Sequence, residues 1–203
     1  MEPWKIYNDV IYGPWNTSGL DMQWKTQMVD GVPYLAFQGS ASAMDWVNNF
    51  RFAAALYKGQ ESVLRVHKGF GKAWKSCNDE VMDNFIKICA LSEETPVITG
   101  HSFGGAMSIL AAEDFFYRTG IKPVVVTFGA PKVVWGKKSE EYFANCATFG
   151  EFEERNDIVP FCPPLPGYKH LEPVKIGDKF CFFKLFNPGK YHQIYGEREE
   201  YFK

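Results

Sequence analysis

The residues Gly100-His101-Ser102-Phe103-Gly104 carry the most direct indication of chemistry in this chain. A short apolar run over residues 96–99 precedes them, and a pattern typical of a helix follows over residues 105–116. A serine between such a strand and such a helix can lie on a sharp turn that exposes its hydroxyl above a sheet. A turn that tight leaves no room for side chains two residues before and after the serine, where this chain has glycine. We therefore expect Ser102 to be a nucleophile.

A serine hydroxyl is a weak nucleophile at neutral pH, so it needs a base, and the base needs an acid that orients it. In hydrolases built on this turn, the acid and then the histidine follow the serine along the chain. His170 and His192 both follow Ser102 and are alternative bases at this point. Asp157 follows an apolar run, in a loop that Pro160 stiffens, and is the expected acid. Asp178 also precedes His192, but a Gly-Asp turn accounts for it.

Periodicity predicts the elements that would position these residues. Two strands over residues 22–28 and 32–37 form a hairpin at Asp30-Gly31. Further strands are expected over residues 63–66, 96–99, 123–128 and 147–152, and helices over 70–88, 105–116 and 137–146. This order points to a parallel α/β sheet. Residues 168–176 and 179–186 predict a second hairpin that turns at Gly177-Asp178. We expect residues 1–203 to form a single domain, an α/β sandwich with antiparallel additions at its edges.

Composition excludes several classes of protein. The chain has 203 residues, 46% hydrophobic and 17% aromatic, which is enough to bury a large core. The formal net charge of -2 argues against a nucleic-acid partner, and no apolar run reaches the ~18 residues that stable membrane insertion needs. The five cysteines show neither a disulfide framework nor zinc spacing, so no metal site is expected. Because the N-terminus also lacks a signal-peptide pattern, we expect a cytoplasmic protein. The oligomeric state stays open.

Six motifs together resemble the class 3 lipases, the family of the filamentous-fungal triacylglycerol lipases. In chain order they are Phe37-Gln38-Gly39-Ser40, Asp45-Trp46, Val66-His67-Lys68-Gly69-Phe70, Thr99–Ala106, Phe128–Val133 and Asn156–Pro160. The family's base likewise lies near the C-terminus, as His192 does here. Two positions depart from the family pattern, with Gln38 where arginine is usual and Phe103 in place of leucine. The resemblance implies an α/β-hydrolase fold with a mostly parallel central sheet, helices on both faces and antiparallel edge hairpins.

The resemblance also implies a role for each site residue. Ser102 would be the nucleophile, Asp157 the orienting acid and His192 the general base of a triad that works without a cofactor or metal. The backbone N–H of Phe103 and the N–H of Ser40, with its hydroxyl as a further donor, would form the oxyanion hole. Such donors hold the charge that develops on the carbonyl oxygen.

The same resemblance places a mobile lid over the site at residues 41–60. Trp46, Val47 and Phe50 would share one helical face with Ala54 and Tyr57. A fixed surface helix with that face packed is the alternative. An opened lid would expose an apolar rim to a lipid interface, which gives a transient contact rather than insertion.

Three functions fit these observations. The first is a serine carboxylester hydrolase that cleaves acylglycerol esters through an acyl-enzyme, with a lipid or small ester as substrate. A phospholipase A1 or a feruloyl-type esterase would use the same residues. A non-catalytic lipid-binding module is the alternative outside the enzymes, and the departures at Gln38 and Phe103 give it some support.

Overall fold

A computed structural model gives the structure of this protein and describes residues 2–11, 13–39, 54–58, 63–181, 188–197 and 199–202. In this part of the chain, the centre of the molecule is a seven-stranded sheet in the order β1-β2-β3-β6-β7-β9-β11. These strands are β1 (Asn16–Ser18), β2 (Met22–Val29), β3 (Val32–Phe37), β6 (Val97–His101), β7 (Val124–Phe128), β9 (Thr148–Glu154) and β11 (Pro173–Ile176). The strands from β3 to β11 run parallel, whereas β1 and β2 are antiparallel additions at one edge.

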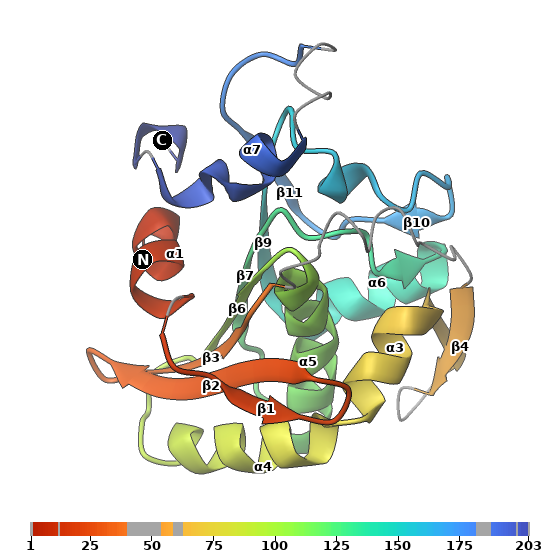
Figure 1. Ribbon diagram of the computed structural model, residues 1–203. Coiled ribbons are helices and arrows are strands. Elements are labelled where there is room, and N and C mark those ends of the chain that lie inside the picture. The colour runs from red at the N-terminus through yellow and green to blue at the C-terminus, as the bar shows by residue number, and fades with distance from the viewer. Residues whose placement is uncertain are drawn as a thin grey trace.

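Helices cover both faces of this sheet (Figure 1). One face packs against α3 (Lys68–Lys75), α4 (Asn78–Cys89), α5 (Phe103–Thr119) and α6 (Lys137–Cys146), around a core with Trp74, Phe85 and Phe115. The other face packs against α1 (Pro3–Val10) and the helical turns η3 (Ile194–Gly196) and η4 (Glu199–Phe202). The two ends of the chain therefore lie on the same face, as Figure 1 shows.

The hairpin predicted at Asp30-Gly31 is confirmed. β2 and β3 pair antiparallel up to Val29 and Val32, and the two residues between them have φ of 50° and 83°. Two consecutive residues with positive φ form the tight turn whose twist matches that of the paired strands.

β5 (Val63–His67) does not belong to the parallel sheet, so this part of the prediction is wrong. It pairs antiparallel with β4 (Ala54–Lys58) and with β8 (Val134–Trp135), which also pairs with β10 (Tyr168–Lys169). These strands form a separate sheet in the order β10-β8-β5-β4. The Ser139 hydroxyl accepts a hydrogen bond from the Arg65 N–H at 2.9 Å and ties this sheet to α6.

The helix predicted over residues 70–88 is two helices, because the chain breaks at Ser76 and Cys77. The Ser76 hydroxyl donates to the Ala73 carbonyl at 2.7 Å and accepts from the Leu20 N–H at 3.1 Å. A Cβ on Gly19 would lie 2.4 Å from the same hydroxyl, so the turn between β1 and β2 packs against the break between the two helices. The apolar period of three and four residues continues through the break and conceals it.

The second predicted hairpin is also wrong. β10 pairs with β8 in the smaller sheet, and β11 pairs parallel with β9, starting from Pro173 opposite Glu151. Residues 179–181 form no strand, and residues 182–186 lie outside the described part of the chain. Alternation indicates that a segment is a strand but does not identify its partner.

Candidate active site

Ser102 lies on the tight turn between β6 and α5. Its φ of 57° and ψ of -124° place a non-glycine residue in a conformation that costs roughly 1–3 kcal/mol. The Ser102 N–H donates to the Phe128 carbonyl at 2.8 Å, and the Ser102 carbonyl accepts from the Gly105 N–H at 2.9 Å. The neighbouring strand and the first turn of α5 therefore hold the strained residue in place. The predicted sharp turn is confirmed.

Glycine is required on both sides of Ser102 because the turn packs against other backbone. A Cβ on Gly100 would lie 2.3 Å from the carbonyl carbon of Gly104. A Cβ on Gly104 would lie 2.3 Å from the Phe37 carbonyl oxygen at the end of β3. The same packing brings Gly39 beside the serine, since a Cβ there would lie 3.4 Å from the Ser102 Cβ. The chain after β3 therefore runs along the site.

Asp157 and His192, which lie 35 positions apart in the sequence, meet at this end of the sheet. Asp157 follows β9, and His192 lies on α7 (Pro188–Gln193). The His192 Nδ1–H donates to Asp157 Oδ2 at 2.8 Å, and the Val159 N–H donates to Asp157 Oδ1 at 2.9 Å. Both side chains are buried. Because Nδ1 carries the proton, Nε2 of the neutral imidazole is free to accept one.

His101 holds the backbone of His192 in place through a hydrogen bond. Its Nε2–H donates to the His192 carbonyl at 2.6 Å, and the two rings lie 4.6 Å apart between their centroids. Burial, together with the nearby His192, lowers the pKa of His101 to about 3, so it is a neutral donor at physiological pH. Since His101 directly precedes Ser102, this contact brings α7, which carries His192, to the turn that carries the serine.

Nε2 of His192 is buried and has no hydrogen-bond partner in the part of the chain that the structure describes. This is the atom that takes the serine proton in a Ser-His-Asp triad. Hydrogen bonds between catalytic groups are often long without substrate and shorten in the complex. Asp157 therefore orients an imidazole whose Nε2 is available to accept a proton.

Sequence reasoning missed Tyr195. Its hydroxyl donates to Asp157 Oδ2 at 2.7 Å and accepts from the Glu154 N–H at 3.0 Å, and its side chain is fully buried. The close approach needs Gly129, whose φ is 58° and where a Cβ would lie 2.8 Å from Asp157 Oδ2. The only signal in the sequence is the spacing of His192 and Tyr195, three positions apart, which aligns them on one side of a helical turn.

His170, the alternative base, lies elsewhere. Its Nδ1 lies 2.9 Å from Glu151 Oε2, and its Nε2 lies 2.8 Å from the Pro160 carbonyl and 3.1 Å from Glu153 Oε1. Burial lowers the pKa of His170, but the two carboxylates outweigh burial and raise it. With both ring nitrogens engaged, His170 is an ion-pair partner rather than a base. Asp178 is exposed at the turn after β11.

The structure places some of the residues predicted for the oxyanion hole and the lid, and others lie outside its described part. Phe103 is the first residue of α5, so its N–H lies at the positive end of a helix dipole. Ser40 and the lid residues Trp46, Val47 and Phe50 lie outside the described residues, and their roles stay predictions. Ala54 and Tyr57, expected on the lid helix, lie instead in strand β4, where Tyr57 is buried. That part of the lid prediction is wrong.

The described residues contain no cluster of histidine, cysteine or acidic side chains that could hold a metal ion. None of the helices they form is both long enough and apolar enough to span a bilayer.

The known proteins that this chain resembles include several lipases. Residues 34–166 match the model of the family "Lipase (class 3)". The chain is 31% identical over 156 residues to the secreted mono- and diacylglycerol lipase 1 of Fusarium solani, which covers 68% of this chain and 42% of the relative. It superposes with a TM-score of 0.71 on the native lipase–propeptide complex of Rhizomucor miehei, at 26% identity, covering 83% of this chain and 57% of that one. A triacylglycerol lipase described as having a serine protease triad as its catalytic centre gives a TM-score of 0.75 at 25% identity, covering 81% and 66%.

These comparisons confirm the expected α/β-hydrolase fold and correct one expectation. The secreted Fusarium relative contradicts the cytoplasmic location expected from the cysteines and the N-terminus. The chain spans less than half the length of that relative.

Proposed function

Because this chain belongs to the class 3 lipase family, we propose that it is a serine carboxylester hydrolase that cleaves acylglycerol esters. The observation that carries this proposal is the buried Asp157–His192 pair at the end of the sheet where the strained Ser102 lies. The fungal relative named as a mono- and diacylglycerol lipase supports acylglycerols as the substrate class. We further propose that residues 1–203 act as one domain, since α1 and η3, from opposite ends of the chain, pack into one core cluster.

Ser102 is assigned the nucleophilic attack. Its Oγ forms a bond to the ester carbonyl carbon while its proton passes to Nε2 of His192. The imidazolium that results is stabilised by Asp157, which already accepts its Nδ1–H at 2.8 Å. The imidazolium then protonates the departing alcohol as the ester C–O bond breaks, which leaves an acyl group on Ser102. A water molecule that His192 deprotonates attacks the acyl-enzyme, and the acid is released as Ser102 regains its proton.

Backbone N–H groups are assigned the stabilisation of the oxyanion, the negative charge that develops on the carbonyl oxygen. The Phe103 N–H at the start of α5 and the N–H of Ser40 are the proposed pair. Gly39 packs against Ser102, and this contact supports a donor from the next residue along. Each such donor is worth ~3 kcal/mol to the transition state, which is about a hundredfold in kcat or more. The Phe103 side chain is not needed for this role, so replacement of the family's leucine does not argue against catalysis.

Hydrolysis assays of the unchanged protein and of Ser102→Ala test the proposal. The substrates are monoacylglycerols, diacylglycerols, triacylglycerols, phospholipids and aryl esters. We expect turnover of the acylglycerols, and complete loss of turnover in Ser102→Ala with an unchanged circular dichroism spectrum. Cleavage of phospholipids or aryl esters alone would show that these esters, and not acylglycerols, are the substrate class. Absence of any hydrolysis would favour a lipid-binding module.

A further inference from the structure

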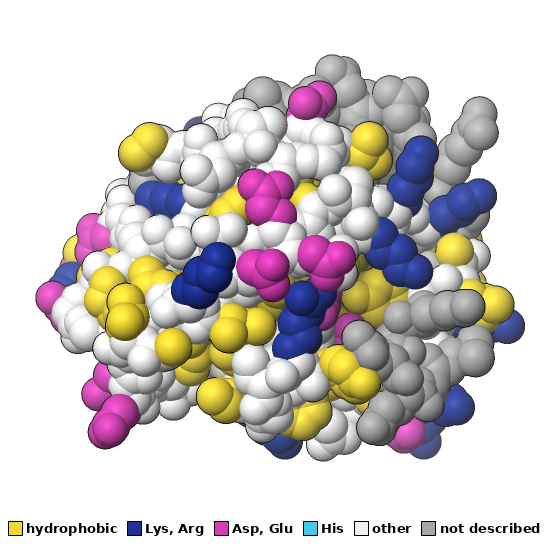
Figure 2. Space-filling model, turned by 90° about the horizontal axis from the view of Figure 1, so that it is seen from below, with side chains coloured by type: hydrophobic (Ala, Val, Ile, Leu, Met, Phe, Trp, Pro, Cys, Tyr) yellow, Lys and Arg dark blue, Asp and Glu magenta, His cyan; other side chains and the backbone are white. Residues whose placement is uncertain are grey.

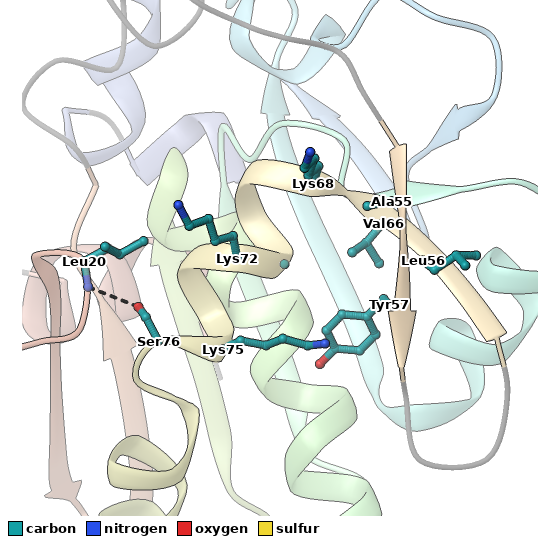
Figure 3. Close-up of a pocket in the computed structure, with 10 residues that line it drawn as sticks. Leu20, Ala55, Leu56, Tyr57, Val66, Lys68, Lys72, Lys75 and Ser76 are labelled. Carbon is teal, nitrogen blue, oxygen red and sulfur yellow. Dashed lines mark hydrogen bonds between the residues drawn. The ribbon is translucent and has the colours of Figure 1, made fainter.

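Three lysines form a row on the outer face of α3. Lys68, Lys72 and Lys75 are spaced four and three positions apart, which places them on one side of the helix. All three are exposed. They border a groove of about 410 Å³ between α3 and β4, whose floor and walls include Val66, Gly71, Ala55 and Tyr57. Figure 3 shows Lys72 on the side of α3 toward Leu20 and Lys75 reaching across the groove toward Tyr57.

Among the described residues, the charge that lines this groove has a single sign. The ten described residues that line it include three lysines and no aspartate or glutamate. None of the ion pairs within the described ranges involves these lysines. The neighbouring helix α4 differs, because its Asp79 pairs with Arg118 at 2.6 Å. On the face seen in Figure 2, acidic and basic side chains likewise lie next to one another. The positive groove is thus a local feature of a chain whose net charge is -2.

Exposed apolar side chains flank the lysine row. Leu20 is 56% exposed on the turn before β2, and Leu56 is 62% exposed on β4. The hydrogen bond from the Leu20 N–H to the Ser76 hydroxyl, 3.1 Å, fixes Leu20 at the C-terminal end of α3 (Figure 3). Lysines beside exposed leucines make a surface with both cationic and apolar contacts, as interfacial elements have.

The groove begins close to the proposed active site. The rings of Phe70 in α3 and Phe103, the residue after the nucleophile, lie 5.9 Å apart between their centroids. The first turn of α3, which carries Lys68, therefore packs beside the catalytic turn.

We propose that the groove between α3 and β4 docks the protein onto a negatively charged lipid surface. Lys68, Lys72 and Lys75 contact the anionic head groups, and Leu20 and Leu56 enter the apolar layer. This proposal rests on the proposed lipase function, for which it specifies the surface on which the enzyme works. A lysine close to an anionic membrane strengthens binding by about fivefold, so three account for about a hundredfold.

Vesicle binding tests the proposal. The vesicles are made of ether-linked phosphatidylcholine, alone or mixed with ether-linked phosphatidylglycerol, because ether lipids resist hydrolysis. The test variant is Lys68→Gln/Lys72→Gln/Lys75→Gln. The matched control is Lys87→Gln/Lys122→Gln/Lys138→Gln, which removes three exposed lysines from other surfaces and gives the same net charge. Thermal unfolding checks that both variants are folded.

We expect the unchanged protein and the control to bind the anionic vesicles far more tightly than the neutral ones. The test variant should lose about a hundredfold in affinity for anionic vesicles, and added salt should weaken binding of the unchanged protein. Equal binding of the test and control variants would overturn the proposal, as would equal binding to both kinds of vesicle. Hydrolysis of a soluble short-chain ester, which needs no surface, should be unchanged in the test variant. Failure of that hydrolysis in the unchanged protein would refute the lipase proposal instead.

Discussion

Replacing Glu113 with glutamine should remove a pH-dependent loss of stability. Glu113 lies on α5, is 2% exposed, and accepts hydrogen bonds from the hydroxyls of Tyr57 at 3.2 Å and Tyr142 at 3.3 Å. Burial and the adjacent Asp114 raise the pKa of Glu113 from 4.5 to about 7, although the two tyrosines oppose this rise. Cys146 also faces this cluster, but burial raises the pKa of its thiol to about 12, so it stays neutral near pH 7.

The direction of the effect follows from the raised pKa. In the unfolded chain the carboxyl ionises near its ordinary pKa of 4.5, whereas in the folded protein it holds its proton up to about pH 7. Its contribution to stability is therefore fully present below pH 4.5 and is lost as pH rises through the folded pKa. One step in pKa corresponds to about 1.4 kcal/mol, so the difference between 4.5 and about 7 amounts to ~3 kcal/mol.

Urea unfolding over a series of pH values measures this contribution. The free energy of unfolding of Glu113→Gln, minus that of the unchanged protein, should rise by ~3 kcal/mol from acidic to alkaline pH. His170, whose pKa is also raised, is present in both proteins and cancels in the difference. The exposed Glu93→Gln is the control and should show no such rise. A difference that stays constant with pH would refute the assignment of this titration to Glu113.

Three further predictions concern the proposed site. Tyr195→Phe removes the hydrogen bond to Asp157 and leaves the buried Glu154 N–H without its acceptor, so urea unfolding should show a loss of ~2 kcal/mol. Its kcat should fall with KM unchanged, and an unchanged kcat would deny Tyr195 a positioning role. Gly104→Ala places a Cβ 2.3 Å from the Phe37 carbonyl oxygen and should cost ~3 kcal/mol or more, whereas Gly189→Ala meets nothing within 4 Å and should be neutral or slightly stabilising. Similar unfolding midpoints for the two alanine variants would contradict the packing argument. Asp157→Asn should lower kcat by about 10⁴-fold because the imidazole loses its orienting carboxylate, and a loss below about tenfold would exclude Asp157 as the acid.

The local chemistry of the site could be predicted from the sequence because short-range geometry determines it. Gly100 and Gly104 predict the turn at Ser102, and a Cβ at either position would collide with backbone. The order of Ser102, Asp157 and His192 along the chain predicts which groups can meet, and the structure brings the last two to 2.8 Å.

Long-range pairing could not be predicted in the same way. The run that forms β5 is compatible with either sheet, and its antiparallel pairing with β4 and β8 decides between them. β11 shows the same ambiguity. Its sequence does not reveal that it pairs with the earlier strand β9 rather than with the segment that follows it. Tyr195 was missed for a related reason, since only the folded chain brings its hydroxyl to Asp157. Glu113 looks like an ordinary helix residue until Tyr57 and Tyr142 surround it.

The most direct measurement for the central claim is labelling with a fluorophosphonate, followed by mass spectrometry of the peptides. A serine activated by a buried His-Asp pair should react once per chain, at Ser102. The label should be absent in Ser102→Ala and its rate strongly reduced in His192→Gln, with both variants folded by circular dichroism. Labelling of a different residue, or unchanged labelling in Ser102→Ala, would contradict the assignment of Ser102 as the nucleophile.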